Sequence, residues 1–173
     1  MSWKGGSKSG TKFENLVNDS FKNIEQFAFH VNANSILKPA CDHRVAFRGL
    51  SFMIEDKKTN SENTSLSLSV LSSDQVQWLD RHDQAGGGVS ALCFRVVWPN
   101  KSRCWIGRWD DIKDYCARHN RKSIPLRPVP DIFTELHQIE RPNGLGKCYD
   151  MLPWLDMAWH RKLEEILSMA WVP

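Results

Sequence analysis

The sequence predicts an α/β fold in which a mixed central β-sheet is flanked by helices. Segments with helical spacing of apolar residues alternate with strand-like segments, in the order helix, three strands, helix, two strands, helix. The segment Val89–Val97 is almost continuously apolar, which is typical of a strand buried on both faces of a sheet. With 173 residues, 41% of them hydrophobic, the chain is long enough for one domain with a substantial core.

Three regions are expected along the chain. Residues 1–10 are rich in glycine, serine and lysine and predict a flexible basic tail. Residues 11–122 carry the alternating pattern and predict the folded core. Residues 123–173 contain several prolines and tryptophans and predict a C-terminal helical extension, packed on the core or placed at a dimer interface.

The first half of the core contains one helix and three strands. Apolar residues at helical spacing predict a helix over 11–26, and the alternation of Phe27, Phe29 and Val31 predicts a first strand. The segments Arg44–Phe47 and Leu50–Lys57 predict a hairpin that turns at Arg48 and Gly49.

The second half of the core begins with an extended connection over residues 60–71. A helix is expected to start with Ser72 or Ser73 as its cap, and Gln75, Trp78, Leu79 and His82 share one stripe of it, which we expect to face inward. Glycines 86–88 break the chain before the buried strand. A further strand is expected at Arg103–Ile106, followed by a helix that Asp110 caps and that ends near Asn120.

The last region predicts a helix over residues 155–170, with an apolar side that includes Leu155, Trp159 and Leu163 together with Ile166, Leu167 and Ala170. Three interpretations remain open for its tryptophans. They pack on the domain, form a dimer or partner surface, or stack on exposed nucleobases.

Composition narrows the class of protein. No run approaches the about 18 apolar residues of a membrane span, and the first residues lack the apolar segment of a secretory signal. Five cysteines, without a Cys-x-x-Cys pair, favour reduced thiols in a cytoplasmic protein. Residues 1–60 hold nine Lys/Arg against six Asp/Glu, and residues 101–130 hold eight against three, which suits a polyanionic partner.

Asp42, Glu55 and Lys57 predict a catalytic site. Glu55 follows Asp42 by thirteen positions and lies in an apolar strand. Side chains two apart in a strand point the same way, so Glu55 and Lys57 project together while Asp56 points away. Two carboxylates beside a lysine favour a divalent cation next to a phosphodiester.

Two further polar residues lie on helices that cover the predicted sheet. Glu14 lies at the edge of the buried stripe of the first helix, where an acid favoured by the helix dipole is the alternative interpretation. Gln75 lies on the inward stripe of the second helix, either as a hydrogen-bonded core residue or as a site residue that holds water or phosphate.

Four motifs in this order resemble the PD-(D/E)xK nuclease superfamily and, within it, the RecU-type Holliday junction resolvases. The resemblance covers about residues 8 to 120. One departure is that Cys41, not proline, precedes Asp42. The motifs are Gly10-Thr11-Lys12-Phe13-Glu14, Glu55-Asp56-Lys57-Lys58-Thr59, Leu71-Ser72-Ser73-Asp74-Gln75-Val76, and Gly86-Gly87-Gly88 with the strand Val89–Val97.

The resemblance implies a restriction-endonuclease-like nuclease core over residues 11–122 and a site completed by Glu14 and Gln75. One or two Mg²⁺ ions, for which Mn²⁺ can substitute, are expected on Asp42, Glu55 and the main-chain carbonyl of Asp56. Lys57 would orient the attacking water or stabilise the charge on the phosphate. The products would be a 5′-phosphate and a 3′-hydroxyl.

The expected substrate is DNA, preferably a four-way junction, cut by a symmetric homodimer in the cytoplasm near the nucleoid, whether the gene is cellular or phage-encoded. The two candidate dimer surfaces are the Trp98-to-Trp109 region and the Trp154–Trp171 helix. The alternatives are a nuclease for linear, flapped or single-stranded DNA, an inert DNA-binding protein on the same fold, and an unrelated structural protein. The residues expected to contact DNA are Lys4, Lys8, Lys12, Arg44, Arg48, Lys58, Thr59, Arg118, Arg121, Lys122 and Arg127.

Overall fold

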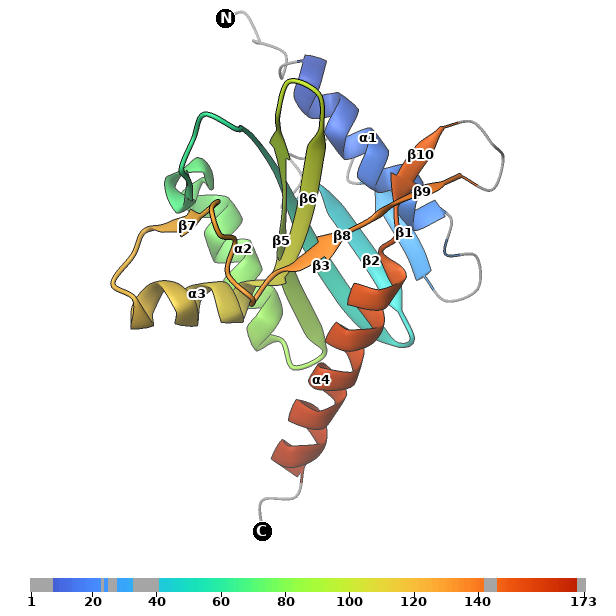
Figure 1. Cartoon of the computed structure of the whole chain (residues 1–173). Coiled ribbons are helices and arrows are strands. Elements are labelled where there is room, and N and C mark those ends of the chain that lie inside the picture. Colours follow the sequence, from blue (N-terminus) through green and yellow to red (C-terminus); the bar gives the residue numbers. More distant parts are fainter. Residues whose placement is uncertain (1–7, 23, 25–27, 33–40, 142–145, 171–173) are drawn as a thin grey trace, which may run out of the picture.

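The computed structural model describes residues 8–22, 24, 28–32, 41–141 and 146–170 and is built on a six-stranded sheet (Figure 1). The strand order is β1-β2-β3-β5-β6-β8. The pair β3–β5 is parallel and the other pairs are antiparallel. The strands are β1 (Ala28–Asn32), β2 (His43–Phe47), β3 (Leu50–Asn60), β5 (Gly88–Val97), β6 (Ser102–Arg108) and β8 (Thr134–Leu136).

Four α-helices flank this sheet, which confirms the predicted mixed α/β class. They are α1 (Lys8–Lys22), α2 (Ser73–Gln84), α3 (Trp109–Arg118) and α4 (Leu152–Ala170). A short 3₁₀ turn, η1 (Leu68–Val70), precedes α2. Two small sheets pair β4 (Ser65–Ser67) with β7 (Ser123–Pro125), and β9 (Gln138–Glu140) with β10 (Lys147–Tyr149).

Each face of the sheet has its own hydrophobic core. On one face, α1 and the first turns of α4 bury Phe13, Val17 and Trp154 against the strands. On the other face, α2 and α3 bury Leu79 and Ile112. The side chains of β3 and β5 alternate between these cores, as the pleat of a strand requires. The run Gly88–Phe94 of β5 is buried throughout, which confirms that this strand lies in the middle of the sheet.

The hairpin and the start of α2 are as predicted. Arg48 and Gly49 have φ angles of 46° and 84°, so the chain reverses through the left-handed turn that suits the twist of a two-stranded hairpin. Ser72 caps α2.

Two helix boundaries differ from the prediction. Helix α1 ends at Lys22 instead of near residue 26, and positions 25 and 26 lie outside the described residues. Helix α3 starts one residue before Asp110, so Asp110 is not its cap. The Asp110 carboxylate instead accepts hydrogen bonds from the buried Arg108 guanidinium and from its neighbour's backbone.

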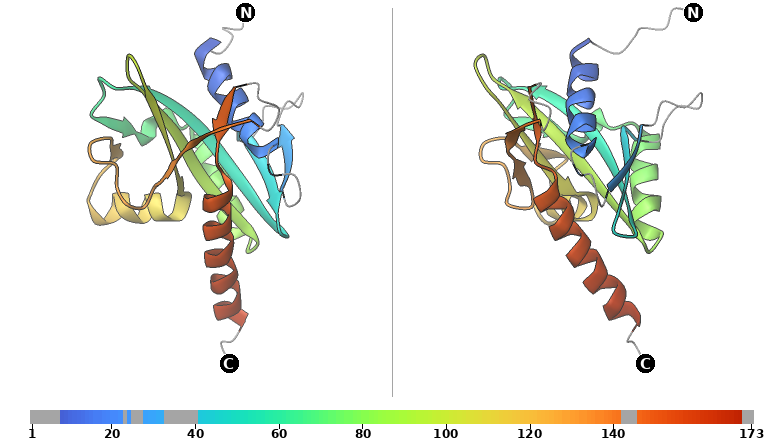
Figure 2. Two further views of the ribbon diagram at one scale, coloured as in Figure 1. Left: turned by 45° about the vertical axis from the view of Figure 1, so that its right-hand side comes forward. Right: turned by 90° about the vertical axis from the view of Figure 1, so that its right-hand side faces the viewer.

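The region after residue 122 contains strands as well as the expected helix. Strand β8 lengthens the central sheet beyond β6, and β7, β9 and β10 form the small sheets. Helix α4 starts at Leu152 and buries Trp154, Leu155 and Ala158. Its second half runs past the end of the sheet, so Leu167 and Ala170 of the predicted apolar side are exposed (Figure 2).

Ion pairs attach this projecting half of α4 to α3 and β6. Arg161 binds Asp111 through two hydrogen bonds of 2.6 Å, and Arg108 reaches Glu165 at 2.9 Å. The chain's five cysteines are all free and buried. Within the part of the chain that the structure describes, no helix combines the length and apolar character needed to cross a membrane.

Candidate active site

Strands β2 and β3 bring Asp42 and Glu55 to the same level of the sheet. His43 pairs with Ile54, so the residue before β2 lies beside the residue that follows Ile54. The Asp42 carboxylate accepts a hydrogen bond of 2.8 Å from the backbone N–H of Asp56. Asp42 is therefore held against the segment of β3 that carries Glu55.

Glu55 and Lys57 share one face of β3, as predicted. The Glu55 side chain is only 1% exposed, and its Oε1 accepts hydrogen bonds from the Lys57 ammonium and from the Gln75 amide. The other oxygen, Oε2, is buried and has no hydrogen-bond partner within the structure. Burial, followed by the nearby Asp42 charge, raises the pKa of Glu55 to about 8.

Gln75 reaches this site from the first turn of α2, where it also forms part of the helix N-terminal cap. Its Oε1 accepts from the backbone N–H of Ser72 at 3.0 Å, and the Ser72 hydroxyl accepts from the Gln75 backbone at 3.2 Å. This capping box fixes the side chain in the first turn of the helix and leaves the amide nitrogen to donate to Glu55. These hydrogen bonds place Gln75 beside Glu55, and its role there stays a prediction.

The stripe predicted around Gln75 is wrong in one position. Leu79 is fully buried, but Trp78 is 43% exposed. The Trp78 ring lies outside the core with the Arg81 guanidinium 5.9 Å from its centroid. The buried stripe of α2 is therefore narrower than the spacing of the apolar residues in the sequence predicts.

The Asp56 side chain lies on the opposite face of β3, also as predicted. It accepts a hydrogen bond of 2.6 Å from His43 Nε2, and His43 Nδ1 donates to the Asn18 side chain of α1 at 3.1 Å. Burial lowers the pKa of His43, but the Asp56 carboxylate outweighs burial, so the pKa is raised and the ring is favoured in its charged form. The site's backbone is thereby braced from α1.

His43 and Asn18 were missed from the sequence. The available signal was His43 itself, a polar residue at an inward position of the alternation Cys41, His43, Val45. Cys41, which stands where the nuclease superfamily has proline, is buried, and its thiol donates to the His43 carbonyl at 3.1 Å. Burial raises the pKa of Cys41 to about 11, which favours the neutral thiol.

Glu14 adds a third carboxyl group on the α1 side. It is partly buried, and burial, followed by the charges of Asp42 and Asp56, raises its pKa. The Lys57 ammonium group forms an ion pair with one of the neighbouring acids, Glu55. The carboxyl groups therefore repel one another in a poorly solvated place, which is the condition that a bound cation relieves.

The donor groups fit a hard cation that keeps part of its water shell. Among the described residues, no three His, Cys, Asp or Glu side chains converge closely enough to form a metal cage. Magnesium needs no such cage, because one or two carboxylates with other oxygen ligands and waters suffice. Asp42 and Glu55 Oε2, which has no partner among the described residues, would supply two such oxygens. The Asp56 carbonyl is the third that the family resemblance implies, since the Asp56 carboxylate is already bound to His43.

The residues predicted to contact DNA fall into separate groups. Lys12, Arg44 and Lys58 are exposed, as are Arg118, Arg121, Lys122 and Arg127, whereas Thr59 is buried with its hydroxyl accepting from Asn63. The Lys122 carbonyl accepts from Leu68, just before α2. Lys4 and the side chain of Lys8 lie outside the described residues.

Arg48 lies apart from the site, in the hairpin turn at the far end of β3 from Lys58. It forms an ion pair of 2.7 Å with Asp156 of α4 and lies 4.8 Å from the centroid of the Phe47 ring. These contacts give Arg48 a role in attaching α4 to the hairpin.

Comparisons with known proteins show a structural similarity to a protein of solved structure. The chain resembles Hjc, a Holliday junction resolvase from the archaeal hyperthermophile Archaeoglobus fulgidus, with 25% sequence identity and a TM-score of 0.35. The similarity covers 55% of this chain and 74% of that one. No family model matches, and no curated protein matches.

The raised pKa of Glu55 predicts a pH-dependent cost of folding in the absence of metal. Between the ordinary pKa of 4.5 and the folded value of about 8, the native state holds a proton that the unfolded state has released. Stability is therefore lost as the pH rises through this window, by on the order of 5 kcal/mol. Urea unfolding in EDTA should show Glu55→Gln to be more stable than wild type at pH 8.5 and similar to it at pH 4.5.

The exposed Glu62 provides the matched control, because Glu62→Gln should follow the wild-type curve at both pH values. Adding Mg²⁺ at pH 8.5 should stabilise the wild type but not Glu55→Gln. A difference between wild type and Glu55→Gln that does not change with pH would contradict the assignment of a buried, charge-repelled carboxylate.

Proposed function

We propose that the protein is a metal-dependent DNA endonuclease. The observation that carries this proposal is the buried Glu55 carboxylate, which lies beside Asp42, holds Lys57 and Gln75 on one oxygen and keeps the other without a partner. An acid buried in this way weakens the fold unless a cation binds it. The ammonium group of the adjacent Lys57 can donate to a phosphate that lies beside the cation.

Each residue then has a task at the phosphodiester. Asp42, Glu55 and the Asp56 carbonyl would hold Mg²⁺ or Mn²⁺, which would supply a water of lowered pKa and offset charge on the phosphate. Lys57, which is paired with Glu55 in the structure, would donate to the attacking water or to a phosphate oxygen. Gln75 keeps Glu55 oriented, and Glu14 accepts hydrogen bonds from water on the α1 side. The products are a 5′-phosphate and a 3′-hydroxyl.

The preferred substrate in this proposal is a four-way DNA junction, and the RecU-type resemblance of the sequence motifs is its support. Exposed basic residues on β2, β3 and the end of α3 contact phosphates, which sets affinity without reading the base sequence. The enzyme would act in the cytoplasm on nucleoid DNA. These phosphate contacts are assigned to Lys4, Lys8, Lys12, Arg44, Lys58, Arg118, Arg121, Lys122 and Arg127.

A symmetric homodimer is the proposed active form, because resolving a junction requires two cuts related by a two-fold axis and each chain carries one site. Of the two candidate surfaces, α4 is favoured. Its Leu167 and Met169 side chains are 50% and 74% exposed, whereas Trp105 and Trp109 are buried in the chain's own core. Exposed apolar side chains on the projecting half of a helix suit contact with a second chain, which is the surface proposed for the dimer.

The first prediction for this function concerns catalysis. Asp42→Asn, Glu55→Gln and Lys57→Ala should each lower the cleavage rate by about a hundredfold or more, since each removes a metal ligand or a donor to the developing charge. Affinity for DNA, which depends on phosphate contacts elsewhere, should remain within about threefold. Single-turnover cleavage and anisotropy on the same four-way, linear and flapped DNAs measure both quantities.

Glu62→Gln again serves as the control and should cleave like the wild type. Calorimetry should show weaker Mn²⁺ binding for the two acid variants. Cleavage by Asp42→Asn at close to the wild-type rate would refute the metal site. Loss of DNA binding in all three variants would instead favour an inert DNA-binding protein.

The second prediction concerns assembly. The double variant Leu167→Glu/Met169→Glu should be a monomer by light scattering at micromolar concentration, because it places charges on the proposed apolar interface. On a cruciform plasmid it should accumulate the singly nicked circle, whereas wild type linearises the plasmid through paired cuts. Glu164→Gln, an exposed position on the same helix, is the control that should remain dimeric.

A wild-type monomer that nicks linear duplex as fast as junctions would rule out the junction-resolving dimer. The metal-dependent nuclease would then remain, acting on linear, flapped or single-stranded DNA.

A further inference from the structure

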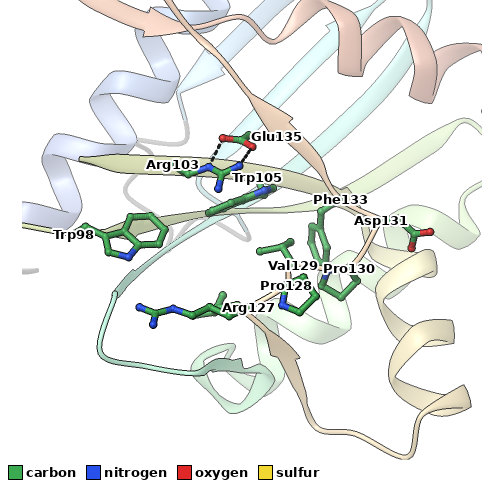
Figure 3. A pocket seen from close by; sticks show the side chains of 11 residues that line it. Trp98, Arg103, Trp105, Arg127, Pro128, Val129, Pro130, Asp131, Phe133 and Glu135 are labelled. Carbon is green, nitrogen blue, oxygen red and sulfur yellow. Dashed lines mark hydrogen bonds and ion pairs between the residues drawn. The ribbon is translucent and has the colours of Figure 1, made fainter. Parts of the chain in front are cut away.

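Two adjoining hollows form a trough on the face of the sheet that α2 and α3 cover in part. The larger, of about 480 Å³, is lined by Trp98, Arg103 and Trp105 from the β5–β6 hairpin and by the segment 126–135 (Figure 3). The second, of about 470 Å³, shares Arg127, Pro128 and Pro130 with the first, so the two are continuous. A further hollow, of about 510 Å³, meets the trough at Trp98, but its Arg95 and Ser102 lie on the α1 face of the sheet.

Aromatic rings alternate with cations along this trough. The Lys101 ammonium lies 5.7 Å from the centroid of the half-buried Trp98 ring. The Arg103 guanidinium lies 5.0 Å from the Trp105 ring, and the centroids of Trp98 and Trp105 are 6.5 Å apart. Tyr115 lines the second hollow. Rings beside cations form a platform for a flat ligand that carries negative charge.

The charge of the trough is positive. Three cationic residues line the two hollows and Lys101 lies beside Trp98 at their edge, against two acids. One of the acids, Glu135, is bound on both oxygens by Arg103, so it neutralises that cation alone. The other acid is Asp131. The cations are Lys101, Arg103, Arg121 and Arg127.

The trough adjoins the candidate active site on the same face of the sheet. Lys57 pairs with Phe94 of β5, and Phe94 pairs with Trp105 of β6. Residues paired in this way share a face, and two strand spacings separate the Lys57 backbone from that of Trp105 by roughly 10 Å. Arg127 is anchored to the end of β3 by a hydrogen bond of 2.7 Å to the Ser61 carbonyl.

From this arrangement we infer that the trough binds a single-stranded stretch of DNA that leads to or from the active site, with an unpaired base on Trp98 and phosphates at Lys101 and Arg127. Bases in a duplex stack on one another and offer no free face to an indole, so the occupant is an unpaired strand. The inference rests on the proposed nuclease function and adds that the substrate carries unpaired nucleotides beside the cut.

The test is binding of a fluorescein-labelled oligothymidylate of about 12 nucleotides, followed by anisotropy in EDTA so that cleavage plays no part. Trp98→Ala should weaken this binding by about tenfold or more, and Trp98→Phe should restore most of it, because every aromatic ring offers a stacking face. Binding to a linear duplex of equal length should change less than twofold. Trp78→Ala removes an indole that is 43% exposed and lies outside the trough, and it should bind like the wild type.

Arg127→Ala and Lys101→Ala provide a second readout that does not depend on the indole. Each should flatten the salt dependence of oligothymidylate binding by about 0.7 in logarithmic slope, the value for one phosphate contact on a single strand. Circular dichroism establishes that each variant is folded.

Equal losses on single strand and duplex, or no saturable binding of the oligothymidylate, would overturn the inference. A trough that binds a peptide instead of DNA would show no saturable binding of the oligothymidylate. Failure of the inference is separable from failure of the nuclease proposal. If Trp98→Ala cleaves junctions normally and also binds oligothymidylate like the wild type, only the trough inference is refuted. If the wild type cuts no DNA but Trp98→Ala still weakens single-strand binding, the trough inference stands and the nuclease proposal is refuted.

Discussion

The Glu55 carboxylate is buried on a strand in the interior of the sheet, next to a second carboxylate and within reach of one ammonium group. Desolvation disfavours its charge, and Asp42 disfavours it further, so the apo fold carries an electrostatic penalty at this place. The surrounding structure keeps the group there despite that penalty. Strand β3 is paired on both sides, and Gln75 holds one Glu55 oxygen from the capped start of α2.

The two faces of β3 make different contacts at the candidate site. On one face, Glu55 and Lys57 meet α2 and adjoin the aromatic trough. On the other face, Asp56 is bound to His43, which reaches Asn18 of α1. The Asp56 backbone N–H links the faces, because it holds the Asp42 carboxylate. A substitution at His43 would therefore act on catalysis through the position of Asp42, without touching substrate.

The strand that carries the candidate site residues could be predicted from the sequence, but not all of the contacts around it. Two-residue periodicity was enough to place Glu55 and Lys57 on one side and Asp56 on the other, because every L-residue strand alternates. Three-residue strands such as β8 lack enough positions to show alternation, so the lengthened sheet was not predicted. The contact between His43 and Asn18 spans 25 positions and belongs to no local period, and only tertiary packing creates it. Trp78 was misplaced because an apolar stripe does not indicate how far a core extends around a helix.

The most direct measurement of the central claim is the anomalous scattering of Mn²⁺ in crystals of the wild-type protein. We expect a peak within coordination distance, about 2.2 Å, of carboxylate oxygens from both Asp42 and Glu55, with the Lys57 ammonium displaced from Glu55. The peak should disappear in crystals of Glu55→Gln. A well-ordered site that holds Glu55 protonated against Lys57 and Gln75, with no manganese between the two acids, would contradict the account.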